Sequence, residues 1–147
     1  MINIVCGPPG SGKTTYVQDH ASWGDLICDV DALYHALTGL PWYEKPDRLL
    51  PFVLKVRDVI IDWTLHYHGQ AFYNAWIITG GARMEMRNRL AMRLRAKVYV
   101  LETSATECIR RISQDPRRAA SWQLWQDLVN RWWQEYEKSD SDIVIRS

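Results

Sequence analysis

Hydrophobic and polar positions alternate in two different rhythms along the chain. Five short runs of mostly apolar residues have the length and β-branched content typical of strands. These runs are residues 2–6, 25–28, 75–79, 97–101 and 142–145. Longer segments with helical periodicity separate them. Strands that alternate with helices in this way predict a parallel sheet covered by helices on both faces.

The clearest helical segment runs from about residue 51 to residue 66. Its apolar residues recur at the spacing expected of a core-facing stripe. They are Phe52, Val56, Val59, Ile60 and Trp63. A second helix is expected to begin at Ser104, because Ser104 and Glu107 have the spacing of a capping box. Residues 121–138 are also helical in pattern, whereas residues 38–46 are rich in Gly and Pro and predict a loop.

Length, charge and cysteine content indicate what class of protein this chain belongs to. The 147 residues suit one domain, spanning residues 1–147, with a single core. A net charge of +1 argues against a dominant electrostatic attraction to nucleic acid or to a membrane surface. Cys6, Cys28 and Cys108 cannot all pair, so we expect thiols in a reducing, cytoplasmic setting. We expect neither a signal peptide before the first strand nor a membrane-spanning segment.

A motif typical of phosphate binding follows directly after the first apolar run. Residues 7–14, Gly-Pro-Pro-Gly-Ser-Gly-Lys-Thr, satisfy the P-loop pattern G-x-x-x-x-G-K-[ST] at every fixed position. Glycines are needed where backbone N–H groups converge on phosphate oxygens, and a helix that begins near Lys13 adds the positive end of its dipole. Lys13 is expected to reach the β- and γ-phosphates, and the Thr14 hydroxyl to ligate Mg²⁺. The pattern thus predicts that ATP or a similar triphosphate binds through Gly7, Pro8, Pro9, Gly10, Ser11, Gly12, Lys13, Thr14 and Thr15.

Two carboxylates, Asp29 and Asp31, follow the second apolar run. Ligands collect at the carboxyl ends of the strands in an open parallel sheet, and an i, i+2 pair on an extended chain points to one side. One carboxylate could hold Mg²⁺ or its waters while the other accepts a proton from the acceptor's hydroxyl group. We assign Asp29, with Thr14, to the metal and Asp31 to the acceptor. The alternative is that Asp31 only caps a helix beginning at Ala32.

Arginines gather in residues 110–120, which we expect to form a lid over the phosphates. Arg111 lies on the helix that begins at Ser104, and Pro116 is expected to end that helix. Arg117 and Arg118 would then lie on a short connection. The planar fork of arginine pairs with phosphate oxygens and stabilises the charge on a transferring phosphoryl group. Arg117, Arg111 and Arg118 are therefore candidate catalytic residues, in that order.

Two further sets of residues have a structural explanation. Five arginines after the third strand are expected to form a solvated helix face; a basic face for a phosphorylated or polymeric acceptor is the alternative. They are Arg83, Arg87, Arg89, Arg93 and Arg95. The C-terminal tryptophans are expected in the core or at an oligomer contact. They are Trp122, Trp125, Trp132 and Trp133. The histidines and cysteines do not have the spacing of a metal site.

Taken together, these motifs resemble the small P-loop kinases: nucleotide kinases, shikimate kinases, gluconate kinases and phage polynucleotide 5′-kinases. The resemblance implies a three-layer α/β fold with a five-stranded parallel sheet of order 2-3-1-4-5. It also implies a kinase that uses ATP and Mg²⁺ and phosphorylates a nucleotide, a nucleoside or a polynucleotide 5′-hydroxyl. Residues 31–33, Asp-Ala-Leu, resemble the segment of polynucleotide kinases in which an aspartate opens the second helix and acts as general base. This match gives Asp31 that role, beside Lys13.

Two other interpretations stay open. The acidic pair, the Thr-Gly-Gly turn at residues 79–81 and the lid arginines also resemble shikimate kinases. This second resemblance implies a kinase of a small metabolite, in which Arg57 and Arg131 could hold a carboxylate of the acceptor. The third strand ends without the acid that many P-loop proteins carry there, and without the aspartate of polynucleotide kinases near Gly80. A nucleotide-binding module that switches a partner without phosphorylating it is therefore the third interpretation.

Overall fold

The computed structural model describes residues 1–146, and its strands form one parallel sheet. The strands are β1 (Ile2–Cys6), β2 (Leu26–Asp29), β3 (Ala75–Thr79), β4 (Lys97–Leu101) and β5 (Ile143–Ile145). Their order across the sheet is β2-β3-β1-β4-β5, and every neighbouring pair is parallel. The predicted sheet is confirmed. Two strands differ from their predicted ranges by a residue at an end: β2 gains Asp29 and loses Asp25, and β5 lacks Asp142.

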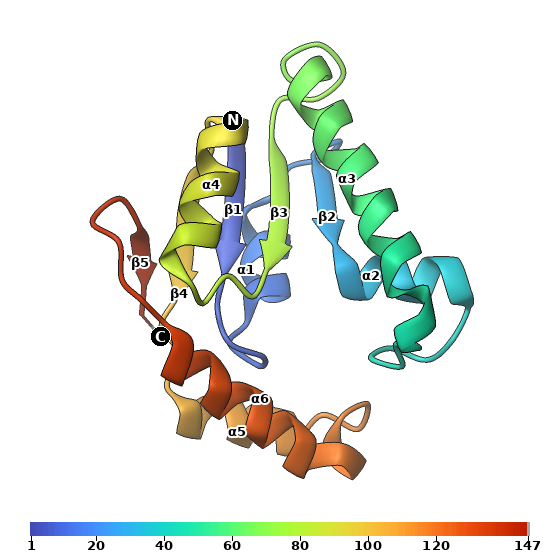
Figure 1. Cartoon of the computed structure of the whole chain (residues 1–147), viewed down its shortest axis with the longest axis vertical. Helices are drawn as coiled ribbons and strands as arrows, with labels where there is room; N and C mark the ends of the chain where they lie inside the picture. The colour runs from blue at the N-terminus through green and yellow to red at the C-terminus, as the bar shows by residue number, and fades with distance from the viewer. Residues whose placement is uncertain (147) are drawn as a thin grey trace.

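Helices cover both faces of the sheet (Figure 1). They are α1 (Lys13–His20), α2 (Val30–Thr38), α3 (Leu50–Tyr67), α4 (Met84–Leu94), α5 (Ala105–Ser113) and α6 (Trp122–Glu135). Short 3-10 helices, η1 (Asp47–Leu49) and η2 (Ala119–Ser121), precede α3 and α6. Ser104 caps α5 as predicted, since its side chain accepts from the backbone N–H of Glu107. In the described part of the chain, no helix combines the length and the apolar character that crossing a membrane requires.

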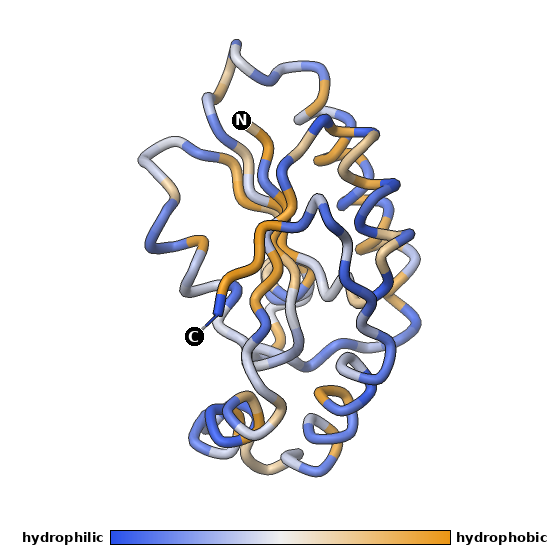
Figure 2. The backbone as a smooth tube through the Cα atoms, turned by 90° about the vertical axis from the view of Figure 1, so that its left-hand side faces the viewer, coloured by the Kyte–Doolittle hydropathy of each residue, from blue (hydrophilic) through white to orange (hydrophobic). Residues whose placement is uncertain are grey.

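Side chains of the central strands alternate between two cores. Ile4 of β1 packs in the core that includes Ile61 of α3 and Leu94 of α4. Val5, the next residue, packs in the opposite core with Val17 of α1. Figure 2 shows the hydrophobic colour concentrated in these strands. Because both faces are covered, the strands carry continuous apolar runs where a half-exposed sheet would show strict alternation.

Helix α3 turns a different face to the core than its apolar spacing predicts. Val53 and Ile61 are buried. Phe52, Val59 and Trp63, which were expected in the core, are 55%, 65% and 42% exposed. For these three residues the prediction was wrong. The helix is apolar on more than one side, and periodicity alone does not say which side meets the sheet.

Helix α6 packs against α5 and builds a third, smaller core beside the sheet. Cys108 and Ile112 of α5 lie in it with Trp125 and Val129 of α6. Trp132, two turns further along α6, belongs to the core that covers the sheet. Trp125 and Trp132 are therefore structural, as expected, whereas Trp122 at the start of the helix is 50% exposed.

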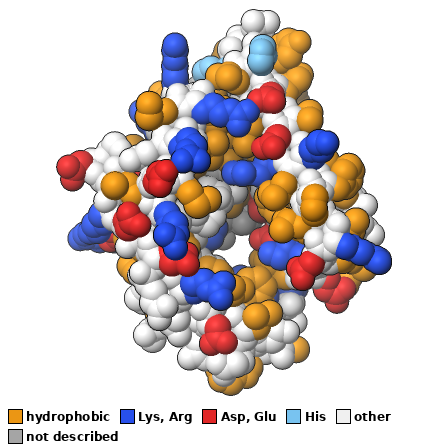
Figure 3. Space-filling model, viewed as in Figure 1, with side chains coloured by type: hydrophobic (Ala, Val, Ile, Leu, Met, Phe, Trp, Pro, Cys, Tyr) orange, Lys and Arg blue, Asp and Glu red, His pale blue; other side chains and the backbone are white. Residues whose placement is uncertain are grey.

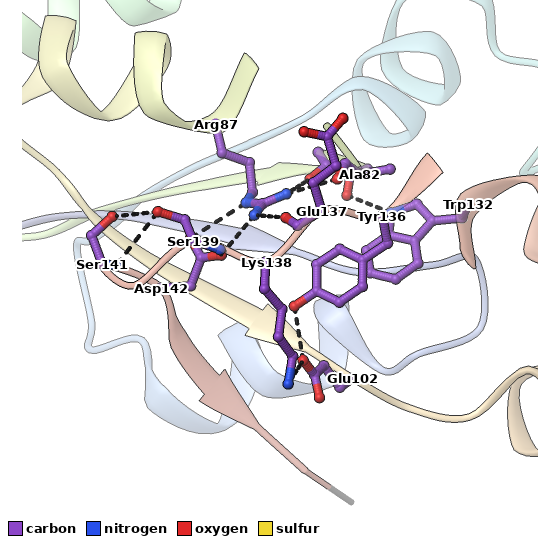
Figure 4. A network of polar contacts seen from close by, with 12 residues as sticks. Ala82, Arg87, Glu102, Trp132, Tyr136, Glu137, Lys138, Ser139, Ser141 and Asp142 are labelled. Atoms are coloured by element: carbon purple, nitrogen blue, oxygen red, sulfur yellow. Dashed lines mark hydrogen bonds and ion pairs between the residues drawn. The ribbon is translucent and has the colours of Figure 1, made fainter. Parts of the chain in front are cut away.

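A buried ion pair joins α4 to the segment before β5 (Figure 4). Arg87 is 1% exposed, and its Nη2 lies 2.6 Å from Oδ2 of Asp142. The guanidinium also donates to the carbonyl oxygens of Gly81, Ala82 and Glu137. The expectation of a solvated arginine is thus wrong for Arg87. It lies seven residues before the buried Leu94, two helical turns away on the same face of α4.

We predict that Arg87→Met lowers the free energy of unfolding by about 3–5 kcal/mol, because it leaves the Asp142 carboxylate buried without a partner. The matched control is Arg89→Met on the same helix, whose ion pair with Glu85 is 77% and 80% exposed. That variant should change stability by less than about 0.5 kcal/mol. Urea denaturation of both variants checks the prediction. Equal decreases in the free energy of unfolding in the two variants would contradict it.

Candidate active site

A cavity of about 900 Å³ lies at the carboxyl ends of β1, β2 and β3. The loop after β1 lines it, together with Asp29 and Asp31 after β2 and Thr79 at the end of β3. Figure 3 shows a hollow near the centre of this face with Lys and Arg side chains around its rim. Pockets for small ligands range from about 300 to 1,000 Å³, so this cavity has room for more than a single phosphate group.

The loop between β1 and α1 has the backbone of a phosphate cradle. Gly10 and Gly12 adopt φ angles of 77° and 94°, which other residues rarely reach. Gly12 is the N-cap of α1, and Lys13 is its first residue. The first N–H groups of a helix have no acceptor within it, so those of α1 are available to an anion.

Helix α5 supports this loop from behind. A Cβ atom on Gly10 would lie 2.8 Å from the carbonyl oxygen of Cys108, so the loop backbone touches the helix. The carbonyl oxygen of Ser11 accepts from Thr103 Oγ1 at 3.0 Å and from Arg111 Nη1 at 3.1 Å. A peptide unit is planar, with its C=O and N–H on opposite sides. These bonds therefore direct the N–H of Gly12 away from α5.

Lys13 lies inside the loop that it follows. Its Nζ donates to the carbonyl oxygens of Gly7 at 2.8 Å and Pro8 at 2.9 Å. Burial lowers the pKa of Lys13 to about 8, and the nearby charges of Asp31 and Asp29 oppose this shift only in part. An anion beside Nζ would favour the protonated form and raise the pKa again.

The two aspartates have different environments. The extended geometry expected for residues 29–31 is wrong, because α2 already begins at Val30. Asp29 is the N-cap of α2, and its Oδ1 accepts from the N–H of Asp31 at 3.1 Å. Burial, followed by the charge of Asp31, raises the pKa of Asp29. Asp29 therefore takes the capping role that was the alternative for Asp31, and the Asp31 carboxylate is not needed as a cap.

Residues from the loop between α2 and η1 contact both the acidic pair and the lid. Lys45 Nζ lies 2.9 Å from Oδ1 of Asp31. The ring of Tyr43 lies edge-on to Trp125, and the guanidinium groups of Arg117 and Arg118 lie 5.3 and 4.7 Å from its centre. Tyr43 and Lys45 were not predicted as site residues, because the local sequence of a loop does not indicate which distant residues it contacts.

Two of the three lid arginines, Arg117 and Arg118, share one carboxylate, whereas Arg111 pairs with Glu107. Helix α5 ends at Ser113, and the turn that follows places Nε of Arg117 and Nε of Arg118 each 3.0 Å from Asp115. The hydrogen bond from Arg117 is the main reason why the pKa of Asp115 falls to about 2. Arg111, Arg117 and Arg118 all line the cavity. The structure thus brings the three arginines to the cavity that the loop after β1 also lines, and Arg111 contacts that loop directly.

Two further arginines line the cavity without a partner of their own. Arg57 comes from α3 and Arg131 from α6. Within residues 1–146, neither guanidinium group makes a hydrogen bond or an ion pair, although both side chains line the same cavity. Unpaired arginines at a cavity wall are suited to an anionic group on a ligand.

The oxygen donors of the cavity fit Mg²⁺ better than a metal that needs a closed protein site. No group of three or more His, Cys, Asp and Glu side chains that could hold a metal occurs in the described residues. Thr14 and Asp29 line the cavity and offer a hydroxyl and a carboxylate. Mg²⁺ keeps several waters and commonly binds few protein oxygens together with substrate phosphates. The donor set is therefore consistent with the predicted ion.

No family model matches the chain, and neither does the sequence of any curated protein. Solved structures do. A gluconokinase from Sinorhizobium meliloti 1021 matches with a TM-score of 0.60 and 14% identity over 98% of this chain and 81% of its own. A sugar kinase from Janibacter sp. HTCC2649 has a TM-score of 0.59 and 21% identity, over 99% of this chain and 84% of its own. The chain has the fold of the P-loop kinases.

The same P-loop kinase fold occurs within the Pnkp1/Rnl/Hen1 RNA repair complex. One chain of that complex matches with a TM-score of 0.61 and 11% identity. The match covers 92% of this chain but 46% of that chain. At these identities the likeness concerns the fold.

We predict that ATP binding at about pH 8.5 takes up a fraction of a proton, because Lys13 is then mostly neutral and the triphosphate raises its pKa. Near neutral pH the lysine is already charged, so its contribution to proton uptake should vanish. Calorimetry in two buffers of different ionisation enthalpy measures the uptake. Lys13→Met should abolish it, and the exposed Lys97→Met should not. Equal uptake in the parent and in Lys13→Met would contradict the assignment.

Proposed function

We propose that the protein is a kinase that transfers the γ-phosphoryl group of ATP to a hydroxyl group of an acceptor. One observation carries the proposal: Lys13, from the phosphate loop, and Asp31, from α2, line the same cavity. A protein that only binds a nucleotide needs Lys13 but not Asp31. The Asp31 side chain, a carboxylate that is not used as a helix cap, suits proton removal from an attacking hydroxyl.

The nucleotide side is built from the loop and from the first turn of α1. Its N–H groups and Lys13 bind the β- and γ-phosphates and balance their charge. Thr14 and Asp29 would hold Mg²⁺, which when bound neutralises charge on the phosphate oxygens. Arg111, Arg117 and Arg118 stabilise the charge that spreads over the transferring group. Arg111 also keeps the loop in shape through its bonds to the carbonyl oxygens of Gly10 and Ser11.

Asp31 acts on the acceptor side. Its carboxylate accepts the proton of the acceptor hydroxyl as the new O–P bond forms. The bond between the γ-phosphorus and the bridging oxygen breaks, and ADP leaves with that electron pair. Lys45 Nζ pairs with Oδ1 of Asp31, and the other oxygen of that carboxylate remains for the acceptor hydroxyl.

The acceptor that we favour is a nucleotide, a nucleoside or a polynucleotide 5′-hydroxyl, as the Asp-Ala-Leu segment suggests. A hydroxy acid is the second candidate, supported by the unpaired Arg57 and Arg131. These two arginines would bind a phosphate group of the first class or a carboxylate of the second.

The experiment that tests the proposal is a screen for transfer of labelled γ-phosphate. Nucleosides, nucleoside monophosphates, 5′-hydroxyl oligonucleotides and hydroxy acids form the panel. Transfer to any of the first three classes supports the favoured acceptor, and transfer to a hydroxy acid supports the second. A protein that binds ATP but phosphorylates none of them would contradict the proposal and favour a switch module.

We expect Asp31→Asn to keep ATP affinity within about twofold but to lower turnover by on the order of 10²–10⁴, the usual contribution of a general base. Lys45→Met is the control, because it removes the ion pair and leaves the base. It should lower turnover far less. Binding and steady-state kinetics on both variants decide, and parental turnover in Asp31→Asn would remove Asp31 from the chemistry.

Arg117→Ala should lower kcat and kcat/KM together, by on the order of 10², because the lid arginine acts mainly in the transition state. Arg117→Lys should recover only part of the loss, since a point charge does not reproduce the planar fork. Arg110→Ala provides the matched control: Arg110 lies on α5, is paired with Glu107 and does not line the cavity. If Arg117→Ala and Arg110→Ala have the same kcat, the lid assignment is wrong.

A further inference from the structure

The outer side of α3 carries an apolar stripe. Phe52, Val56, Val59 and Trp63 follow one another at intervals of four, three and four residues. Phe52, Val59 and Trp63 are among the large exposed hydrophobic residues. Figure 1 places α3 at the right-hand margin of the molecule, and Figure 3 shows apolar side chains along that margin.

The spacing of these four residues indicates what kind of element could pack against the stripe. Intervals of four, three and four residues match the alternation of the two core positions along the seam of a coiled coil. Such a seam packs against a second helix with the same pattern. We propose that α3 pairs with α3 of a second copy of this chain, antiparallel and about a twofold axis.

The stripe is complementary to itself in one antiparallel register. When the axis passes between residues 57 and 58, Phe52 meets Trp63 of the second copy, and Val56 meets its Val59. The twofold axis repeats both contacts, so all four positions of the stripe are filled. An isologous interface requires this reciprocity, in which residue i contacts residue j and j contacts i.

Charges beside the stripe agree with the same register. Lys55 and Asp62 are seven residues apart and flank the stripe on one side. In the antiparallel pair, Lys55 of each copy lies next to Asp62 of the other, which gives two ion pairs of opposite charge. Asp62 already binds Arg93 through Oδ1 within its own chain, and its other carboxylate oxygen remains for Lys55.

The exposed area of the stripe limits the size of the interface. Fully buried aromatic side chains contribute about 150–250 Å² each. Phe52, Val59 and Trp63 are between 42% and 65% exposed, and Val56 is less exposed. Together with the flanking residues, two copies would bury on the order of 1,000 Å², the lower bound for a specific interface. We therefore expect a reversible dimer that forms in the micromolar range.

The active cavity stays open in this dimer. Leu54 and Arg57, the residues of α3 that line the cavity, project from the opposite side of the helix to Val59. The dimer is thus independent of the proposed kinase activity, and either assignment can fail without the other.

Sedimentation equilibrium from about 1 to 500 µM protein, the range of a weak complex, tests the pairing. The mass should rise from 17.2 kDa toward twice that value. Val59→Arg should keep the protein monomeric, because it places two cations in the centre of the seam. Trp23→Arg is the control: Trp23 is 101% exposed and lies outside the stripe, so its dimer should be unchanged.

The register has its own test. Lys55→Asp should weaken the dimer at least about tenfold through like charges, and the double variant Lys55→Asp with Asp62→Lys should restore it. A chain that stays monomeric at every concentration would overturn the proposal. So would a dimer that persists in Val59→Arg, because that dimer would use another surface.

Discussion

The buried guanidinium of Arg87 joins the turn after β3 and the helix α4 to the connection between α6 and β5, which is distant in the sequence. Its five N–H groups meet five acceptors: the carbonyl oxygens of Gly81, Ala82 and Glu137 and both oxygens of Asp142. A charge is tolerated in a core only when it is paired and hydrogen-bonded in this way. The pair therefore holds the turn after β3, the helix α4 and the connection from α6 to β5 in one arrangement.

The phosphate loop depends on the same turn. The carbonyl oxygen of Gly80, next to the residues that Arg87 binds, accepts from the N–H of Gly7 at 3.2 Å and from Trp132 Nε1 at 2.8 Å. One end of the loop and the last turn of α6 are thus bound to the same carbonyl oxygen. Helix α6 in turn packs on α5, which supports the loop from behind and leads into the lid. A small displacement of this turn would therefore move both the phosphate loop and the segment after α5.

The sequence predicted the parts of the site that depend on local pattern. The phosphate loop is one continuous segment whose glycines, lysine and threonine are recognisable by spacing, and the strand order followed from the resemblance to P-loop kinases. Contacts between distant segments were not predictable. Tyr43 contacts Arg117 and Arg118, and Arg87 is buried against Asp142, because separate helices and loops pack together in the folded chain. For α3 the pattern correctly predicted a helix but not which of its sides faces the sheet. The helix carries apolar residues on two sides, and the sequence alone does not show which of them the sheet covers.

The proposed site combines a phosphate-binding half with an acceptor half, and this proposed combination separates a kinase from a nucleotide-binding switch. The most direct measurement follows ADP and inorganic phosphate in one reaction, with ATP, Mg²⁺ and a mixture of nucleosides, nucleotides, 5′-hydroxyl oligonucleotides and hydroxy acids. Our account predicts that the mixture increases ADP formation and that ADP exceeds inorganic phosphate, because the phosphoryl group goes to an acceptor. ADP formation that is unchanged by the mixture, or that is matched by an equal amount of inorganic phosphate, would contradict it.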